Sequence, residues 1–396
     1  MLPILIRMNI LTVLLFAIVS FAYGQDRKIS SYINPGCSYC PPDKTLVYTK
    51  AIGSDNTIHQ IWDFTGGLPT IIFVIGTVNS SLHITWDGTN PDKFLMSDEP
   101  RYSFAAAIDK LYEYDDVEDV GHIDPSVPQK AYSLRHMYWA RNASKMTETE
   151  AMVAVRGHFQ DRAGLLEMKL DLLPFNDYAV QLPHLIHTAN STLVDVSVVN
   201  VTSSRAYNAS RFALHLLLVS TDPAGDTMRY SMRRSLDDEH TPGVFEIVEI
   251  KTPESSRNSD GGFIQFRPVA YTQQERSVAS STNAHISNFN KTLIPARSTL
   301  DKFYSYKYDP HDLLVQDIFI SFGETGDGYY KQHNYTAWSF TIGYGEPPIE
   351  SFSLFVIVII SIGLGVPVLL ALSGVTYVVV KKYRARNAPT RFTDDD

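Results

Sequence analysis

An all-β domain, exported across a membrane and carried on one membrane-spanning helix, is the fold class that this 396-residue sequence predicts. Two apolar stretches bracket the chain, and only the second is long enough to span a bilayer. Between them, short segments alternate between apolar and polar residues, which is typical of half-buried antiparallel strands. Acceptor triplets for N-linked glycans fall only in this middle part, as expected for a segment that faces a lumen or the outside of the cell.

The N-terminal stretch, residues 1–24, predicts a cleaved secretory signal peptide. A lone Arg7 precedes the apolar residues 11–22, and Ala22-Tyr23-Gly24 supplies a cleavage-site pattern before Gln25. An uncleaved N-terminal anchor is the alternative interpretation of the same residues.

Residues 25–350 predict a glycosylated β-rich ectodomain with a sandwich-like architecture. Gly, Pro, Asn and Asp clusters separate the alternating segments, and helix-forming patterns are scarce, with residues 104–112 ambiguous. The length allows one large core or two ordinary ones, so a division into two lobes near residues 200–230 stays open. The polar residues 251–262 and 273–282 are expected to be surface loops. The strand candidates are residues 71–78, 82–86, 152–159, 166–172, 194–198, 212–219, 245–250, 318–322 and 338–342.

Seven N-x-S/T triplets without proline predict N-glycosylation of the ectodomain. Dense glycosylation protects a chain from proteases, which suits a hydrolase-filled compartment or a cell surface. The net charge of −9 argues against nucleic acid and anionic membrane surfaces as partners. The acceptors are Asn79, Asn142, Asn190, Asn200, Asn208, Asn290 and Asn334.

The cysteine pair Cys37-x-x-Cys40 predicts a short disulfide in a loop, because an exported chain meets oxidising conditions. A redox centre is the alternative for this spacing. A zinc site lacks the remaining ligands, since no second C-x-x-C or H-x-x-x-H follows. His184 and His187 form an H-x-x-H pair without a neighbouring acidic helix, which makes a metalloenzyme the weaker interpretation.

The acidic residues are expected to lie in solvated turns rather than in calcium sites, because they lack the spaced D-x-D-x-D-G pattern. These clusters are residues 237–240 and the group Asp115, Asp116, Glu118 and Asp119. Gly323, Gly326 and Gly328 indicate a turn between strands. No nucleophile elbow, phosphate-binding loop or dinucleotide fingerprint occurs, and a carboxylate pair for glycoside hydrolysis is not recognisable from sequence. The sequence thus predicts no catalytic residues, no metal and no cofactor.

Residues 351–380 predict a transmembrane helix, and residues 381–396 a cytosolic tail. The uncharged residues 354–380 would form about 40 Å of helix, more than the roughly 30 Å hydrocarbon core. Lys381 and Lys382 follow at once, so the positive-inside rule predicts a type I orientation. Ser361 and Gly365 form a small-xxx-small pair that could let another helix approach closely.

Five sequence blocks in order resemble the glycosylated lysosomal membrane protein family. They are IHQIWDFTGGLPTIIFVIGT (residues 58–77), YSLRHMYWARNAS (132–144), SLDDEHTPGVFEI (235–247), GFIQFRPVAYTQ (262–273) and GDGYYKQHNYTAWSFTIGYGEPP (326–348). The blocks are spread over most of the ectodomain, with the signal peptide and the span in their expected places.

The resemblance implies a non-enzymatic protein of the lysosomal membrane with its ectodomain in the lumen. It implies an accessory subunit that binds a multi-span, major-facilitator-type transporter that exports dipeptides. Its role would be to stabilise that partner against luminal proteolysis. The aromatic-rich residues 329–345, close to the span in sequence, are the expected docking surface, with an ordinary strand and turn as the alternative.

Two departures from the family separate this chain from its vertebrate members. The tail sequence Tyr383-Arg384-Ala385-Arg386 lacks the bulky apolar fourth residue of a tyrosine-based sorting signal, and no cysteine follows Cys40. Two other functions remain as alternatives: a lysosomal or cell-surface ectodomain that binds glycans or hydrolyses a substrate, and a cell-surface receptor.

Overall fold

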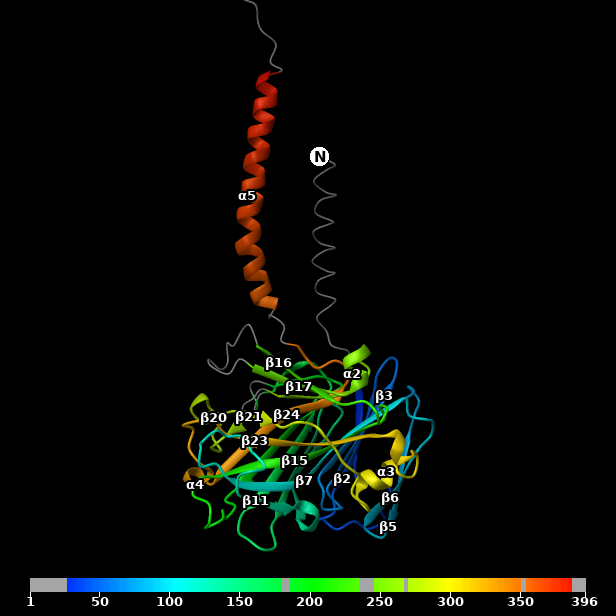
Figure 1. Cartoon of the computed structure of the whole chain (residues 1–396). Helices are drawn as coiled ribbons and strands as arrows, with labels where there is room; N and C mark the ends of the chain where they lie inside the picture. The colour runs from blue at the N-terminus through cyan, green and yellow to red at the C-terminus, as the bar shows by residue number, and fades with distance from the viewer. Residues whose placement is uncertain are drawn as a thin grey trace, which may run out of the picture. The chain divides into compact units, whose positions relative to one another are not determined.

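The computed structural model of this chain describes residues 27–179, 182, 185–234, 246–266, 270–349 and 354–386 (Figure 1). The predicted signal peptide, residues 1–24, lies outside these ranges, as do residues 387–396 of the predicted tail. The chain forms two compact units, of which one ends at Pro348 and the other begins at Ile349.

The first sheet of the ectodomain contains ten strands among the described residues, all paired antiparallel. Its order is β1-β2-β3-β4-β7-β15-β23-β21, with β8 beside β7 and β22 beside β23. The strands are β1 (Lys28–Ile33), β2 (Leu46–Ile52), β3 (Thr57–Asp63), β4 (Thr70–Gly76), β7 (Tyr102–Asp115), β8 (Gln129–Ser133), β15 (Ser210–Ser220), β21 (Ala284–Ile286), β22 (Asn290–Lys291) and β23 (Leu314–Phe322).

The second sheet also contains ten described strands, in the order β16-β17-β18-β24-β14-β11-β10-β9, with β19 and β20 beside β24. Strand β24 is the last strand in the chain, yet it lies in the middle of this sheet between β18 and β14. The strands are β9 (Tyr138–Met146), β10 (Ala151–His158), β11 (Leu165–Leu172), β14 (Ser191–Val199), β16 (Arg229–Arg234), β17 (Glu246–Lys251), β18 (Gly262–Phe266), β19 (Ala270–Tyr271), β20 (Ser281–Thr282) and β24 (Tyr335–Tyr344).

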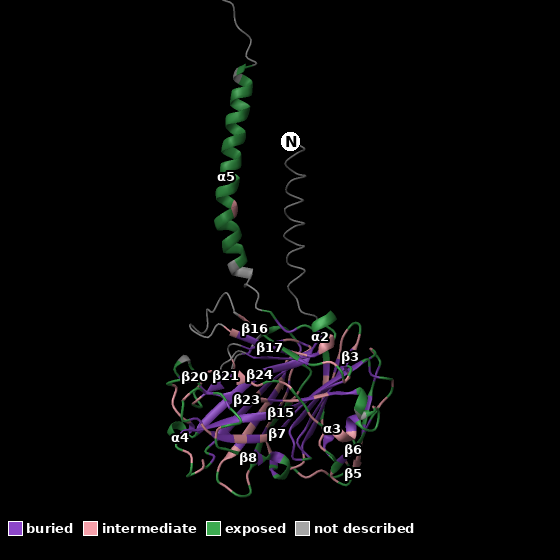
Figure 2. Ribbon diagram, viewed as in Figure 1, coloured by how far each residue is buried: buried purple, intermediate pink, exposed green. Residues whose placement is uncertain are grey.

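The two sheets pack face to face, and one large apolar cluster takes side chains from both. Figure 2 shows the strands of both sheets largely buried. The cluster includes Trp62, Phe104 and Leu214 from the first sheet and Val153, Leu170 and Trp338 from the second. This arrangement confirms the predicted all-β, sandwich-like fold class.

The outer face of the first sheet is covered as well, which explains its continuous apolar runs. Strands β3 and β4 are buried at every residue. A hairpin of β5 (Leu82–Asp87) and β6 (Asn90–Met96) packs with the short helix α3 (Thr299–Tyr304) over that face. A sheet that is buried on both faces has no need for alternation, so its strands are uniformly apolar.

The second sheet shows the opposite pattern on β10 and β11. Their side chains alternate between buried and accessible. On the accessible face, Arg156 and Glu167 are register partners whose Nε and Oε1 atoms lie 2.5 Å apart. The alternation that the sequence shows in these segments therefore marks a face exposed to solvent.

Two sequence expectations are corrected by the fold. The ambiguous residues 104–112 lie inside the long strand β7. Residues 253–258, which were expected to be loop, form the helix α2 (Pro253–Asn258). Thr252 caps this helix by accepting from the Ser255 amide, Pro253 occupies the first turn and Ser259 ends it in the left-handed conformation.

The remaining described elements are short. Strands β12 (Asp177–Tyr178) and β13 (Ile186–His187) form a small hairpin. The helical turns are η1 (Leu134–His136), η2 (Val278–Ser280), η3 (Pro310–Asp312) and α4 (Tyr330–His333).

The division into two lobes near residues 200–230 stays a prediction. Strands β14 and β15, which precede and follow residue 200, belong to different sheets. After residue 230 the chain contributes strands to both sheets again, ending with β23 in the first and β24 in the second.

Among its described residues, the second unit contains one helix, α5 (Leu354–Arg386), of 33 residues. Its residues Ile357–Arg384 are long and apolar enough to cross a membrane, as the sequence predicts. The hydroxyls of Ser373 and Thr376 donate to main-chain oxygens one turn earlier, at 2.9 and 2.7 Å, so neither polar group is left unpaired in lipid.

Gly262 marks the point where the sheets approach most tightly around Phe104. A Cβ atom at this position would lie 2.1 Å from Cγ of the Phe104 ring. The Gly262 amide also donates to the buried hydroxyls of Tyr102 and Thr252, which fixes its main chain in place. Neither the backbone nor the ring can move aside without opening the core.

We therefore expect Gly262→Ala to lower the free energy of unfolding by about 1–3 kcal/mol, as overpacking of a dense core does. The measurement is thermal unfolding of the full-length protein in detergent. Gly225→Ala is the matched control, because a Cβ there would meet nothing within 4 Å. Equal melting temperatures for the two variants would contradict this account of Gly262.

Candidate functional site

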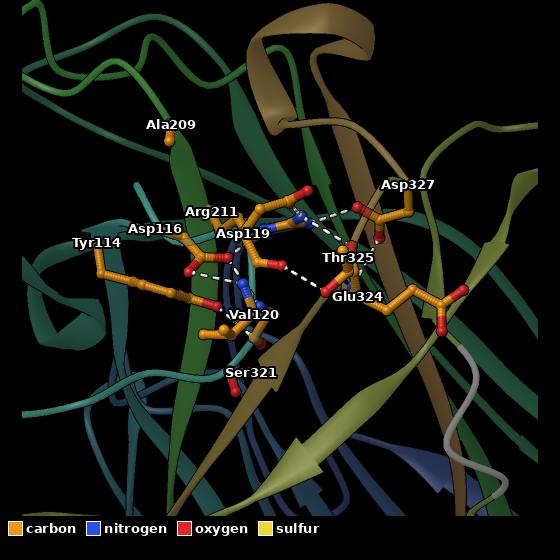
Figure 3. Close-up of polar contacts among 12 residues, drawn as sticks. Tyr114, Asp116, Asp119, Val120, Ala209, Arg211, Ser321, Glu324, Thr325 and Asp327 are labelled. Carbon is orange, nitrogen blue, oxygen red and sulfur yellow. Dashed lines mark hydrogen bonds and ion pairs between the residues drawn. The ribbon is translucent and has the colours of Figure 1, made fainter.

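A buried arginine joins three segments that are far apart in the sequence. Arg211 lies on β15, residues 116–121 follow β7, and residues 323–328 connect β23 to the short helix α4 before β24. Figure 3 shows the two connecting segments converging on the guanidinium from opposite sides. This arginine cluster comprises Arg211, Asp116, Asp119 and Asp327.

Each nitrogen of the Arg211 guanidinium contacts a different carboxylate. Nε donates to Asp116 Oδ2 at 2.7 Å, and Nη2 donates to Asp119 Oδ1 at 2.5 Å. Nη1 lies 2.7 Å from Asp327 Oδ1. Nη2 also donates to the main-chain oxygen of Glu324 at 3.1 Å, and the Tyr329 ring lies 5.1 Å from the guanidinium. Each of the three guanidinium nitrogens therefore contacts a group of the protein itself.

The carboxylates are held in turn by main-chain amides. Asp116 accepts from the amides of Val120 and Gly121 at 3.1 and 2.7 Å. Asp119 accepts from the Gly326 amide at 2.8 Å. Because each carboxylate is bonded to a segment as well as to Arg211, the cluster fixes both connections to β15.

The charged side chains of this cluster are buried, so each needs a partner to offset the cost of losing water. The side chains of Arg211, Asp116 and Asp327 are only 4%, 3% and 7% exposed. Burial alone would lower the pKa of Arg211, but hydrogen bonds and charge from Asp327 and Asp119 outweigh burial and raise it. Burial, and then the charge of Asp116, raise the pKa of the Tyr114 hydroxyl, which donates to the Gly121 oxygen at 3.0 Å. The Arg211 guanidinium therefore stays charged, and the Tyr114 phenol stays neutral, at physiological pH.

Two glycines make the approach feasible. Gly323 has φ +136°, and a Cβ on it would lie 2.1 Å from Arg211 Nη1. Gly121 has φ +73°, and a Cβ on it would lie 1.9 Å from the Gly323 oxygen. Only glycine fits both the positive φ and the contact distance.

A small cavity adjoins the cluster between β15, the 323–328 connection and β24. Its lining includes Phe212, Thr282, Tyr329, His333 and Tyr335. The space open to the centre of a water molecule is about 20 Å³. That is room for about one water, and it is too small for a sugar or a peptide.

The cluster overturns one sequence expectation. The acidic residues 115–119 were expected in a solvated turn, yet Asp116 is buried and paired with a cation from another strand. The sequence held one signal for this pairing: Arg211 lies in the otherwise apolar run of β15, and a charge in a buried strand requires a partner. Which carboxylates supply it depends on contacts across about a hundred residues of chain.

A second arginine binds the outer face of the second sheet. Arg276 makes a two-point ion pair with Asp195 on β14, at 2.6 Å for both atom pairs, and donates to Ser339 on β24 at 2.8 Å. Residues 273–282 lie largely at the surface, as expected, and Arg276 binds them across the middle of the sheet. Arg211 and Arg276 therefore both form ion pairs that join distant segments of the same chain.

The predicted glycan acceptors lie at the surface, with one exception. The exposed acceptors are Asn79, Asn142, Asn200, Asn208, Asn290 and Asn334. Asn190 is half-buried, and its Oδ1 accepts from Arg27 Nε at 2.6 Å. Burial lowers the pKa of Arg27 to about 10, and its Nη1 atom donates to the main-chain oxygens of Ala51 and Asn56. Modification of these asparagines stays a prediction.

The other sequence-predicted sites fall in separate places. Cys37 and Cys40 are joined by a disulfide in the β1–β2 connection, with Tyr39 between them 80% exposed. His187 is buried, and its Nδ1 pairs with the Phe175 main-chain oxygen at 2.8 Å. His184 lies outside the described residues, as do residues 237–240.

The expected docking surface at residues 329–345 is largely wrong. Strand β24 occupies residues 335–344, and every one of its residues is buried in the middle of the second sheet. Its aromatic residues fill the core because both of its edges are paired, with β14 and β18. Only the residues before Tyr335 include surface positions.

The paired groups of the arginine cluster can join segments of the fold. Within the described ranges, no three His, Cys, Asp or Glu side chains come together in a way that could hold a metal ion. The acids of the arginine cluster face a cation rather than an open cavity. The arrangement can hold these connections against the sheet, because ion pairs join each of them to β15.

Comparison with known proteins matches this chain along most of its length. The family model described as glycosylated lysosomal membrane protein matches residues 45–385. The glycosylated lysosomal membrane protein of Danio rerio is 28% identical over 377 residues, covering 90% of this chain and 89% of that protein. Those of Bos taurus and Homo sapiens are each 27% identical, over 359 and 386 residues, covering 86% and 92% of this chain and 85% and 90% of their own lengths.

We expect Arg211→Met to destabilise the ectodomain by about 3–5 kcal/mol, because it leaves buried carboxylates without their cation. Thermal or denaturant unfolding of the full-length protein measures the loss. Arg156→Met is the matched control: its ion pair with Glu167 is exposed, so its removal should cost less than about 1 kcal/mol. Similar losses in the two variants would show that the arginine cluster does not hold the fold.

We expect single Asn→Gln substitutions at the six exposed acceptors to remove one glycan each, seen as a stepwise gain in gel mobility. The melting temperature should stay unchanged at Asn79, Asn142 and Asn208, whereas Asn200 and Asn334 have the left-handed φ values of 51° and 52° that Gln adopts less readily. Asn190→Gln should differ, because it also breaks the bond from Arg27 and costs about 1 kcal/mol. Asn142→Gln on β9 is the control for the stability effect. An acceptor variant without a mobility change would show that its site is unoccupied.

Proposed function

Because the chain belongs to the glycosylated lysosomal membrane protein family, we propose that it is a non-enzymatic accessory subunit of a membrane transporter. The partner is a multi-span, major-facilitator-type transporter of the lysosomal membrane that exports dipeptides. The subunit binds this partner and stabilises it against luminal proteolysis.

The location follows from the family and from the single described span. Members are named for the lysosomal membrane, and the helix Ile357–Arg384 fits a type I topology with the ectodomain in the lumen. Basic residues follow the span directly, as on a cytosolic side.

The observation that supports the protective role is a rigid domain with glycan acceptors around its surface. Six acceptors are exposed and come from both sheets and their connections, while the segments between strands are fastened by Arg211 and Arg276. Glycans on a domain of this kind would cover both the subunit and a neighbouring protein. Because the fastened segments would unfold locally only slowly, proteases would cleave the ectodomain itself slowly.

The alternative of a glycan-binding or hydrolytic ectodomain has less support. The cavity beside Arg211 has room for about one water, and its arginine and aspartates are already paired with one another. A substrate site would need open polar groups at a larger cavity.

The span supplies a candidate contact for the partner. Ser361 and Gly365 are four residues apart, so they lie on one face of α5, and the space where a Gly365 Cβ would project is open. Small side chains at this spacing let a second helix approach closely in lipid. We propose this pair as the docking face.

The test is affinity purification of the full-length protein from membranes in mild detergent, followed by mass spectrometry. We expect a multi-span transporter in near-stoichiometric amount, and a clear loss of it in the double variant Ser361→Leu/Gly365→Leu. Ser373→Leu is the matched control, since it changes a small residue elsewhere on the same helix.

The outcomes separate the parts of the proposal. If the transporter is retained after residues 351–380 are replaced by an unrelated span, the ectodomain makes the contact and the docking face is wrong. If no multi-span protein co-purifies, the accessory role fails. Deletion of the subunit should also lower the abundance of the transporter while its transcript stays constant.

A further inference from the structure

A second titratable side chain, His215, lies in the same apolar strand as Arg211. It is 6% exposed and points to the outer face of the first sheet, like Arg211, whereas Leu214 and Leu216 enter the core between the sheets. Its ring packs against Tyr112 and Phe319, with centroids 6.1 and 4.8 Å away. Nothing in the arginine cluster or in the proposed function uses this imidazole.

A carboxylate faces each nitrogen of the His215 ring. Nδ1 lies 3.5 Å from Asp109 Oδ2, and Nε2 lies 3.4 Å from Asp317 Oδ2. Asp109 is on β7 and Asp317 is on β23, the two strands that flank β15 in the sheet. The three side chains therefore form a row across β7, β15 and β23, which we call the histidine row.

A β-bulge places Asp109 in this row. Along β7 and β15, His215 is the partner of Lys110, but Leu216 is already the partner of Ile108. Asp109 is the extra residue, so its side chain joins the face that Lys110 occupies instead of entering the core. Without the bulge, strict alternation would send one of these two charged side chains into the apolar cluster.

The number of hydrogens on the ring decides how many carboxylates it can bind. A neutral imidazole carries one N–H and presents a lone pair at its other nitrogen. In the histidine row that lone pair faces a carboxylate, and Nδ1 has no hydrogen-bond partner in the present geometry. The protonated imidazole carries two N–H groups and can donate to Asp109 and Asp317 together.

Neighbouring groups contact the two carboxylates that face the ring. On β7, Lys110 lies 3.3 Å from Asp109. Burial raises the pKa of Asp109, but the contact with His215 and the charge of Lys110 outweigh burial and leave the pKa below its ordinary value. Beside β23, the uncharged Asn290 of β22 donates to Asp317, and its neighbour Lys291 bonds the Ala224 oxygen instead. The phenol of Tyr112 completes the titratable groups around the ring.

We propose that His215, Asp109 and Asp317 form a proton-operated clasp that fastens β7, β15 and β23 in an acidic compartment and loosens at neutral pH. The clasp strengthens the ectodomain where proteolysis is most active. It rests on the geometry of the histidine row and does not depend on the identity of a transporter partner.

The direction of the effect follows from proton linkage. The folded state gains a second contact between the ring and a carboxylate only when the His215 imidazole carries two N–H groups, so the added stability is present at acidic pH and is lost as the pH rises. His59 acts in the opposite direction: burial, and then the charge of Lys50, lower its pKa to about 4, so acid pH opposes its folded state. The net pH dependence of the whole protein mixes both effects, and only a comparison of variants isolates the clasp.

The experiment compares melting temperatures of the full-length glycosylated protein in detergent at about pH 5 and about pH 7.5, on either side of the imidazole titration. His215→Gln keeps one donor and one acceptor but cannot take a proton. We expect it to lower the melting temperature by about 2–4 °C more at the acidic pH than at the neutral pH. His187→Gln is the matched control, a buried histidine that bonds a main-chain oxygen, and it should show no such acid-specific loss.

An equal loss at both pH values for His215→Gln would overturn the proposal, because it would mean that the ring acts only by packing. If this variant does not fold, Asp317→Asn decides, since Asp317 is more exposed than His215 and the imidazole stays in place. An acid-specific loss in Asp317→Asn supports the clasp, and a loss independent of pH contradicts it.

Discussion

Charge neutralisation along β15 is the constraint on which the first sheet depends. This strand is buried at every residue and still carries Arg211 and His215. Both side chains point to the outer face, and both find their carboxylates on segments that belong to or follow the flanking strands β7 and β23. A buried charge without a partner costs several kcal/mol, so β15 can stay in the middle of the sheet only while these neighbours hold their positions.

The same constraint acts on the connections between the strands. Arg211 fastens the connections that leave β7 and β23, and Arg276 fastens residues 273–282 across β14 and β24. The connections between strands, which are normally the weakest parts of a β sandwich, are therefore bonded to the sheets. Most of the glycan acceptors remain at the surface outside these contacts, where a glycan does not disturb the core.

Prediction from sequence succeeded where one local pattern decides the outcome. The alternation in β10 and β11, the apolar runs in β4 and β15, and the long uncharged helix were all recognisable. It failed where long-range pairing decides. Aromatic residues of β24 were considered as a docking surface, with an ordinary strand as the alternative, because they come last before the span; the structure places them buried inside the sheet. Asp116 was taken for a solvated residue because its partner Arg211 lies far along the chain.

The sequence by itself predicted export, a C-terminal span and its orientation, the glycan acceptors and the β class, because signal, hydropathy, charge flanks and alternation are local properties. Only the tertiary structure decided the strand order, the burial of β24 and the pairing of every charged side chain in β15. The physical reason is that the local sequence around an aspartate does not distinguish a solvated turn from a buried ion pair or a contact with a histidine. Its role is set by which charge the fold brings within about 4 Å, and no local pattern encodes that distance.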